Sequence, residues 1–174
     1  MDNDLTANEF ILRSPSMEGS ELIPENYVSD GSGYHGKNIS PPLEWKGAPP
    51  ETKSFALTIT DPDAAVKGGW RHWILANIPA DIHSIAEGAS SKGLLPKETI
   101  EIENDFEEFH YGGPCPPKKD KPHRYVFTLY ALKSEKLNVE PESERIEFET
   151  ALRNNILAKT SFTIKYGANS PRPN

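Results

Sequence analysis

Short apolar runs with β-strand character alternate along this chain with loops rich in proline and glycine. The run 124–132 is rich in aromatic and β-branched residues, and the run 54–60 alternates so that every second side chain is large and apolar. The run 71–78 is apolar on both sides, as in a central strand that is buried on both faces. The 16 prolines and 12 glycines cluster between these runs. This pattern is typical of a loop-rich β protein.

One segment, at about 142–158, has a helical pattern. Acidic residues beside Pro141 suit the positive end of a helix dipole, and Phe148, Leu152 and Ile156 recur at four-residue spacing. We expect this apolar face to pack on a sheet edge. Several strands, one late helix, few other short helices and no regular βαβ alternation predict a mainly β protein, a sandwich of antiparallel or mixed sheets. A further strand is expected at 161–167, and weaker strands are expected at 10–14, 42–45 and 99–103.

Length and composition predict a single domain over residues 1–174, with 168–174 as a flexible tail. The net charge of −7 argues against nonspecific binding to nucleic acid or to anionic lipid surfaces. No apolar run approaches the roughly 20 residues that span a bilayer, and the first ten residues lack the features of a signal peptide. The single cysteine, Cys115, cannot form an internal disulfide, which fits a reducing cytoplasm.

Polar side chains gather at two junctions between a loop and a core strand. Asp61 and Asp63 follow one strand directly, and His72 begins the next, so the connecting loop returns His72 to the rim where Asp61 lies. Farther along, His123 and Tyr125 are two residues apart and share one face of their strand. Such junctions on a rigid scaffold are common functional sites.

The segment YGGPCPP, residues 111–117, adds two consecutive glycines and several prolines to the second junction. Glycines let the backbone approach a ligand and offer N–H groups, and prolines stiffen a wall. Imidazole, phenol and N–H groups donate hydrogen bonds to a phosphate or carboxylate, and an aspartate can orient a histidine. The pattern predicts a pocket for a small anion.

Each feature also has a plain structural interpretation. Asp-Pro-Asp alone is a turn sequence, and for that motif in isolation we favour the turn. His72, flanked by Trp70 and Trp73, fits a buried core histidine, and His123 fits an ordinary strand start. No HExxH, CxxC or GxSxG spacing supports a metal site or a serine hydrolase, and Cys115 has no evident base beside it. We therefore expect no metal, no cofactor and no catalytic residue.

The combination of motifs is more specific than its parts. DPDA at 61–64, HW at 72–73 and YGGPCPPKKDKPHRYVFTLYAL at 111–132, together with SPPLEW, NIPA and NDF in order, resemble the phosphatidylethanolamine-binding protein family. This family is also called the Raf kinase inhibitor protein family, and the likeness is to its bacterial and archaeal branch. It covers most of the chain. It implies a β-sandwich with a small pocket near one end that binds phosphate or a phosphorylated headgroup.

Two departures from the family pattern stand out. The family commonly has a proline where this chain has Ala65, which implies a softer or wider pocket wall, and the basic segment KKDK at 118–121 fits a solvated loop. Carried over residue by residue, the resemblance implies these ligand-binding residues: Asp61, Asp63, Trp70, His72, Gly113, Pro114, His123 and Tyr125.

The leading hypothesis is a cytoplasmic, non-enzymatic binding protein for a small anion, whether phosphate, a phosphorylated headgroup or a carboxylate. The family name adds a regulated protein partner, a kinase or hydrolase, and bacterial relatives suggest a homodimer. No nucleic acid and no transmembrane segment are expected. Two alternatives stay open: a hydrolase-type enzyme with Asp61 and a histidine as a general-base pair, and a pure protein-interaction module with a vestigial pocket.

Overall fold

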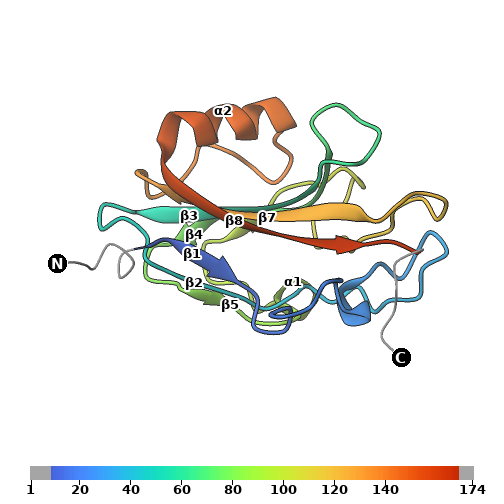
Figure 1. The fold of residues 1–174 in the computed structure, drawn as a ribbon. Coiled ribbons are helices and arrows are strands. Elements are labelled where there is room, and N and C mark those ends of the chain that lie inside the picture. Colours follow the sequence, from blue (N-terminus) through green and yellow to red (C-terminus); the bar gives the residue numbers. More distant parts are fainter. Residues whose placement is uncertain (1–8, 169–174) are drawn as a thin grey trace.

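A five-stranded antiparallel sheet forms the larger layer of the computed structural model, which describes residues 9–168 (Figure 1). The smaller sheet is also antiparallel, so the sandwich predicted from the sequence is confirmed, with antiparallel rather than mixed sheets. The larger sheet has the order β6 (Ile100–Glu101), β4 (Trp70–Pro79), β3 (Ser54–Asp61), β7 (His123–Leu132) and β8 (Ile156–Tyr166). The smaller sheet has the order β1 (Ile11–Arg13), β2 (Leu43–Lys46) and β5 (Ser84–Ile85).

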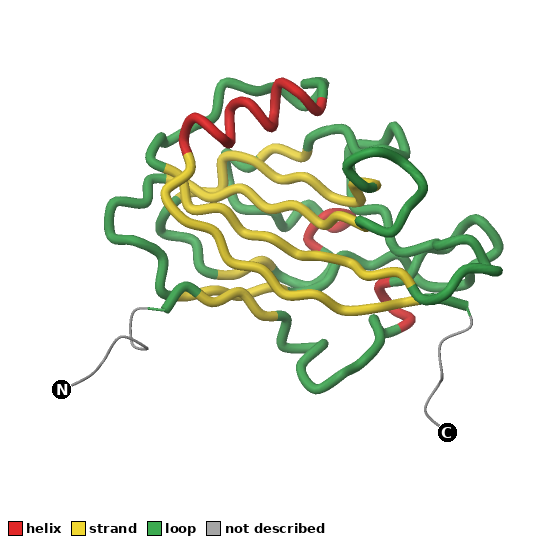
Figure 2. The backbone as a smooth tube through the Cα atoms, turned by 45° about the horizontal axis from the view of Figure 1, so that its top comes forward, coloured by secondary structure: helices red, strands yellow, loops and turns green. Residues whose placement is uncertain are grey.

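Helices are short and lie outside the two sheets. The longest lies over the larger sheet, on the side away from the smaller one (Figure 1), and loops gather at both ends of the strands (Figure 2). No helix within residues 9–168 is long and apolar enough to cross a bilayer. The predicted tail, 168–174, lies outside the described residues except for Ala168. The helices are a 3-10 turn at Glu25–Tyr27, α1 at Ala89–Lys92 and α2 at Arg145–Asn155.

The helix α2 is the predicted late helix, but it is shorter than the interval 142–158. It begins at Arg145 because Glu144 and Glu147 form a capping box, each side chain binding the backbone N–H of the other residue. It ends because Ile156, predicted on its apolar face, is instead the first residue of β8 and pairs with Leu132 of β7. Strand pairing therefore overrides the continuing helical spacing.

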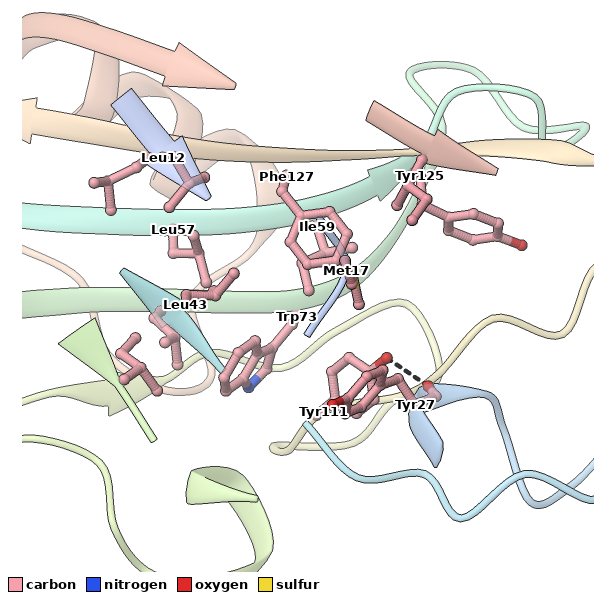
Figure 3. Close-up of a cluster of buried hydrophobic side chains, with 14 of the residues drawn as sticks. Leu12, Met17, Tyr27, Leu43, Leu57, Ile59, Trp73, Tyr111, Tyr125 and Phe127 are labelled. Atoms are coloured by element: carbon pink, nitrogen blue, oxygen red, sulfur yellow. Dashed lines mark hydrogen bonds between the residues drawn. The ribbon is translucent and has the colours of Figure 1, made fainter. Parts of the chain in front are cut away.

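Two hydrophobic clusters lie on the two faces of the larger sheet. The cluster between the sheets contains Leu57, Trp73 and Phe127 (Figure 3). The cluster on the outer face joins Ile74 to Phe148 of α2. The helix thus covers the face of the sheet rather than its edge, where we expected it. Because β4 contributes to both clusters, its side chains are buried on both faces, as its apolar pattern predicted.

A β-bulge in β4 sets the direction of the side chains at its start. Ile59 of β3 pairs with Trp73 and the next residue, Thr60, pairs with Arg71, so His72 is an extra residue in the register. Such a bulge re-aims a side chain beside the point where pairing is disrupted. His72 turns toward the inner face, against Tyr125, while Arg71 turns to the outer face and binds Asp105. The side chains of Arg71 and His72 therefore lie on opposite faces of the sheet.

Candidate functional site

A cavity of about 300 Å³ opens at the end of the sandwich where β3 ends and where β4 and β7 begin. Five of the eight predicted ligand-binding residues line it, and each projects from the inner face of the larger sheet. The antiparallel pairing of β3 with β4 sets Asp61 opposite Trp70, and the pairing of β3 with β7 sets Thr60 opposite Val126, so the two loop–strand junctions lie side by side. The five residues are Asp61, Trp70, His72, His123 and Tyr125.

Asp61 uses its two carboxylate oxygens for two different purposes. Oδ1 accepts a hydrogen bond of 2.8 Å from the backbone N–H of Asp63, which closes the turn after β3. Oδ2 lies 2.6 Å from Nδ1 of His123 on the neighbouring strand. The turn interpretation of Asp-Pro-Asp is confirmed, and the same carboxylate also contacts His123.

Asp63 lies outside the cavity. Its carboxylate accepts hydrogen bonds from the guanidinium group of Arg124 at 2.8 and 3.1 Å, and from the Arg124 backbone N–H at 2.8 Å. The side-chain hydrogen bond from Arg124 lowers the pKa of Asp63 to about 2, so the carboxylate is ionised near neutral pH. Arg124 also lies outside the cavity lining, since it alternates with His123 and Tyr125 along β7. Asp63 ties the turn to β7 and does not line the cavity.

His123 lies between two carboxylates. Its Nδ1 is 2.6 Å from Asp61 and its Nε2 is 2.9 Å from Asp120, and only 6% of its side chain is exposed. Burial alone would lower the pKa of His123, but the hydrogen bonds to the two carboxylates, with their charges, outweigh it and raise the pKa. An imidazolium donates from both nitrogens, which satisfies both partners. The three side chains together carry a net charge of about −1.

His72 is held in the opposite protonation state. Burial lowers its pKa, and its Nδ1 lies 2.8 Å from the carbonyl oxygen of Gly112. A neutral ring that donates from Nδ1 keeps Nε2 as an acceptor. The rings of Phe106 and Tyr125 stand edge-on to it, with centroids at 5.2 and 5.3 Å. His72 therefore adds a polar but uncharged group to the cavity wall.

Two donors in the cavity wall lack a partner. The hydroxyl of Tyr125 and the indole N–H of Trp70 are buried, and neither has a hydrogen-bond partner among residues 9–168. Burial raises the pKa of Tyr125 far above its usual range, so the hydroxyl keeps its proton. Figure 3 shows this hydroxyl pointing away from the hydrophobic cluster. These are the groups that a ligand with acceptor oxygens would satisfy.

The glycine-rich loop does not offer the N–H groups that we expected it to offer a ligand. Gly112 donates to the carbonyl oxygen of His72 at 3.1 Å, and Gly113 donates to Oδ1 of Asn38 at 2.7 Å. A Cβ atom at Gly113 would lie 2.4 Å from the carbonyl oxygen of Tyr27, so glycine is needed for close approach to the chain itself. Gly113 and Pro114 lie outside the cavity lining, and the residues just after them take that place.

Sequence reasoning did not select several residues of the cavity wall. We expect Asp120 in a solvated loop because lysines surround it in the sequence, but it lines the cavity. Its spacing of three residues from His123 is the signal in the sequence that points to their contact. Burial raises the pKa of the Cys115 thiol, which keeps it protonated and unreactive. Across the described residues, His, Cys, Asp and Glu side chains form no group of three arranged to hold a metal ion. The remaining lining residues are Ala64, Ala65, Val66, Phe106, Cys115, Pro116, Pro117 and Asp120.

With this geometry in place, the chain can be compared with known proteins. Residues 13–167 match the family model described as phosphatidylethanolamine-binding protein. The chain belongs to this family. It is 39% identical to the UPF0098 protein YbcL of Escherichia coli over 162 residues, which cover 92% of this chain and 88% of the relative. It is 41% identical to a UPF0098 protein of Methanothermobacter thermautotrophicus over 148 residues, covering 85% and 92%.

Solved structures agree with this assignment. The crystal structure of E. coli YbcL, described as a new member of the mammalian PEBP family, matches with a TM-score of 0.86 and 39% identity, covering 91% of this chain and 98% of that one. A PEBP homologue from Chlamydia trachomatis, CT736, matches with a TM-score of 0.76 and 31% identity, covering 91% and 97%. The protein is thus a phosphatidylethanolamine-binding protein family member of the bacterial and archaeal branch.

Proposed function

We propose that the cavity binds a small ligand through an oxyanion, whether phosphate, a phosphorylated headgroup or a carboxylate, and does not turn it over. One observation carries the proposal: the buried Tyr125 hydroxyl and Trp70 indole N–H line the cavity without acceptors. A buried donor left unpaired costs roughly 1–3 kcal/mol. Oxyanion oxygens in the cavity would supply the missing acceptors, and membership of a family named for phospholipid binding supports this chemistry.

The shape of the cavity supports a small ligand with a short apolar portion. A volume of about 300 Å³ is at the lower end of the usual range for small-molecule sites. Val66 and Phe106 contribute apolar groups to the wall, and Asp61 and His123 contribute polar groups. A headgroup-sized molecule could place its oxyanion at the polar groups and its carbon atoms against the apolar groups.

The same contacts favour binding over catalysis. A general base needs a nitrogen that is free to take a proton, but both nitrogens of His123 are bound to carboxylates. His72 donates from Nδ1 to a backbone carbonyl, and burial lowers its pKa, so its Nε2 is a weak base. Cys115 has a raised pKa and so is a poor nucleophile. Regulation of a kinase or hydrolase, a cytoplasmic location and a homodimer stay predictions.

Calorimetric titration with inorganic phosphate, phosphoethanolamine and acetate tests the proposal in the parent protein and in Tyr125→Phe. The substitution removes a hydroxyl that has no hydrogen-bond partner among residues 9–168, so we expect the free energy of unfolding to stay unchanged. Affinity should fall roughly tenfold or more, because the ligand loses a hydrogen bond. The three ligands separate a lipid-type headgroup from free phosphate and from a carboxylate.

Tyr111→Phe is the matched control. The Tyr111 hydroxyl lies outside the cavity and donates to the carbonyl oxygen of Tyr27 at 2.6 Å. Its loss should lower stability by about 1 kcal/mol and leave affinity unchanged. A parent protein that is folded but binds none of the three ligands would refute the proposal. Equal affinities of the parent and Tyr125→Phe would refute the role given to the Tyr125 hydroxyl.

A further inference from the structure

Asp120 occupies the outer nitrogen of His123. Asp61 holds Nδ1 from the buried side, where 5% of its side chain is exposed, and Asp120 holds Nε2 at 2.9 Å with 37% of its side chain exposed. Asp120 and His123 both line the cavity. With Nδ1 bound to Asp61, Nε2 is the nitrogen of His123 that remains for a ligand. In the structure, the carboxylate of Asp120 is hydrogen-bonded to this nitrogen.

The charges around His123 make this contact more than a detail of packing. Two carboxylates flank one imidazolium, and His72 adds no charge, so an anion that entered the cavity would meet a net negative group. It would also find no free N–H on His123. An oxyanion therefore binds favourably only after the carboxylate of Asp120 has left, since like charges in a partly dry site repel strongly.

Asp120 is placed so that it can leave. It lies in the exposed segment between Pro117 and Pro122, and its backbone N–H donates to the carbonyl oxygen of Pro117 at 3.0 Å, which holds a turn. Rotation of the side chain alone would release His123 without breaking this turn. Lys119 and Lys121, its exposed neighbours, would then lie beside the released carboxylate.

We propose that Asp120 is an internal competitor for the ligand: its carboxylate occupies the place on His123 that the ligand's oxyanion takes, and it is displaced when the ligand binds. This inference rests on the proposed function and makes Asp120 a determinant of affinity, because its carboxylate opposes every anion that binds Nε2 of His123. A simple carboxylate only replaces one carboxylate with another. A phosphate has further oxygens available to accept from the buried donors of Tyr125 and Trp70, which have no partner among residues 9–168, so the parent protein should prefer phosphate to acetate.

Titration of Asp120→Asn and Asp120→Ala with inorganic phosphate and with acetate tests the inference. Asparagine keeps the size of the side chain and removes the charge, and alanine removes the competing group. Both variants should bind phosphate roughly tenfold more tightly than the parent, because the displaced charge no longer opposes the ligand. The affinity for acetate should rise by a similar factor, so the preference for phosphate should stay unchanged.

Glu108→Gln is the matched control, because it removes one negative charge in the loop beside Asn104 without any contact to His123. Its affinity for phosphate should equal that of the parent. Nuclear magnetic resonance of the His123 ring gives a second readout, since loss of Asp120 should lower the pKa of His123 in protein to which no ligand has been added.

The outcomes separate the two proposals. If the parent binds phosphate and the Asp120 variants bind it equally or more weakly, the competitor is refuted while the binding function stands. If only the Asp120 variants bind phosphate, both proposals are supported, and the Asp120 carboxylate prevents measurable binding in the parent. If folded parent and variants all fail to bind phosphate and acetate, both proposals fall.

Discussion

At the scale of single residues, the two cavity histidines show how position decides protonation. His72 is enclosed by aromatic rings and a backbone carbonyl, and burial lowers its pKa. His123 is just as buried, yet two carboxylates raise its pKa. Burial thus favours the neutral form of His72 on β4, and the neighbouring carboxylates favour the protonated form of His123 on β7.

These opposite shifts predict how stability depends on pH. The unfolded chain binds protons at His72 more readily than the folded protein does, so the stability that depends on His72 falls as pH drops through about 6.5. The contribution of His123 is present below about pH 6.5 and is lost as pH rises through its raised pKa, where Asp61 and Asp120 lose their cationic partner. Stability should therefore decline on both sides of a maximum.

Urea unfolding at several values from about pH 5 to about pH 9 measures this dependence in the parent, in His72→Gln and in His123→Gln. The first variant should flatten the acid side of the profile, and the second should flatten the alkaline side. Parallel profiles for all three proteins would contradict the opposite shifts. Asp63, with a pKa of about 2, titrates well below this range and does not confuse the comparison.

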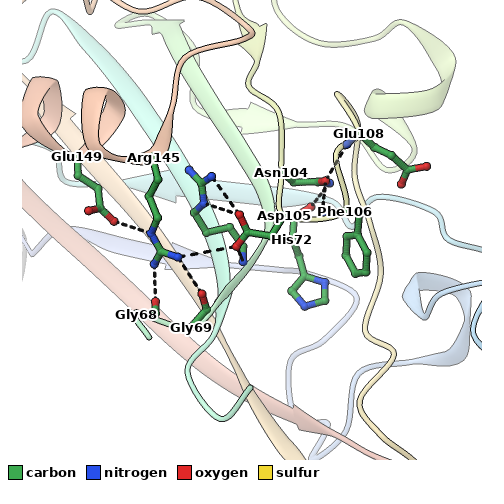
Figure 4. Close-up of polar contacts among 10 residues, drawn as sticks. Gly68, Gly69, His72, Asn104, Asp105, Phe106, Glu108, Arg145 and Glu149 are labelled. Atoms are coloured by element: carbon green, nitrogen blue, oxygen red, sulfur yellow. Dashed lines mark hydrogen bonds and ion pairs between the residues drawn. The ribbon is translucent and has the colours of Figure 1, made fainter. Parts of the chain in front are cut away.

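At the scale of elements, α2 contacts two segments that lead into the cavity wall, although it packs on the opposite face of the sheet. Arg145, the first residue of α2, donates to the carbonyl oxygens of Gly68 and Gly69, the latter at 2.9 Å (Figure 4). A Cβ atom at Gly69 would lie 2.8 Å from the carbonyl oxygen of Asp61, so the loop folds tightly against the end of β3. Arg145 also lies 3.8 Å from Asp105, the residue before the cavity wall at Phe106. The Arg145 side chain thus contacts both the loop before β4 and the segment that leads to Phe106.

We therefore predict that Arg145→Ala weakens phosphate binding by roughly tenfold, although Arg145 lies outside the cavity lining. The loop 62–69, which carries Ala64, Ala65 and Val66, should also exchange its amide hydrogens faster. Arg153→Ala is the control. Arg153 lies on the same helix, and its guanidinium group donates a hydrogen bond to the Thr150 hydroxyl at 3.4 Å, far from the loop 62–69 in the sequence. Equal phosphate affinities for the two variants would show that α2 does not position the wall.

At the scale of the whole molecule, the larger sheet carries a cluster on each face, and the fold depends on both. The inner cluster joins the two sheets, while the outer cluster joins β3, β4 and β7 to α2. Phe148 of α2 is 1% exposed within the outer cluster, and Ile146, on the same helix, is 61% exposed. The helix therefore has one face that belongs to the core and one that faces solvent.

Phe148→Ala should lower the free energy of unfolding by about 3–5 kcal/mol, since it removes a fully buried aromatic side chain and leaves a cavity. Ile146→Ala should change it by less than about 0.5 kcal/mol, because the side chain is already exposed. Urea denaturation of both variants measures the difference. Similar losses would mean that α2 is not anchored through the outer cluster.

Sequence alone predicted most of the strands and the faces on which many of their side chains lie. Phe55, Leu57 and Ile59 share the inner face of β3, and Arg124 opposes His123 and Tyr125, because alternation along a strand is a local property of the backbone. Five of the eight ligand-binding residues that the resemblance implied line the cavity. Membership of the family was also readable from motifs in order, since those motifs are local.

Tertiary structure alone decided which donor meets which acceptor. The bulge at His72, the use of the Gly113 N–H by Asn38 and the contact of Asp120 with His123 all depend on how loops close over distant segments. Strand periodicity assigns a side chain to a face, but it does not say which group on another loop will lie within hydrogen-bonding distance. For that reason the pair of carboxylates around His123, from Asp61 and Asp120, could be recognised only in the folded chain.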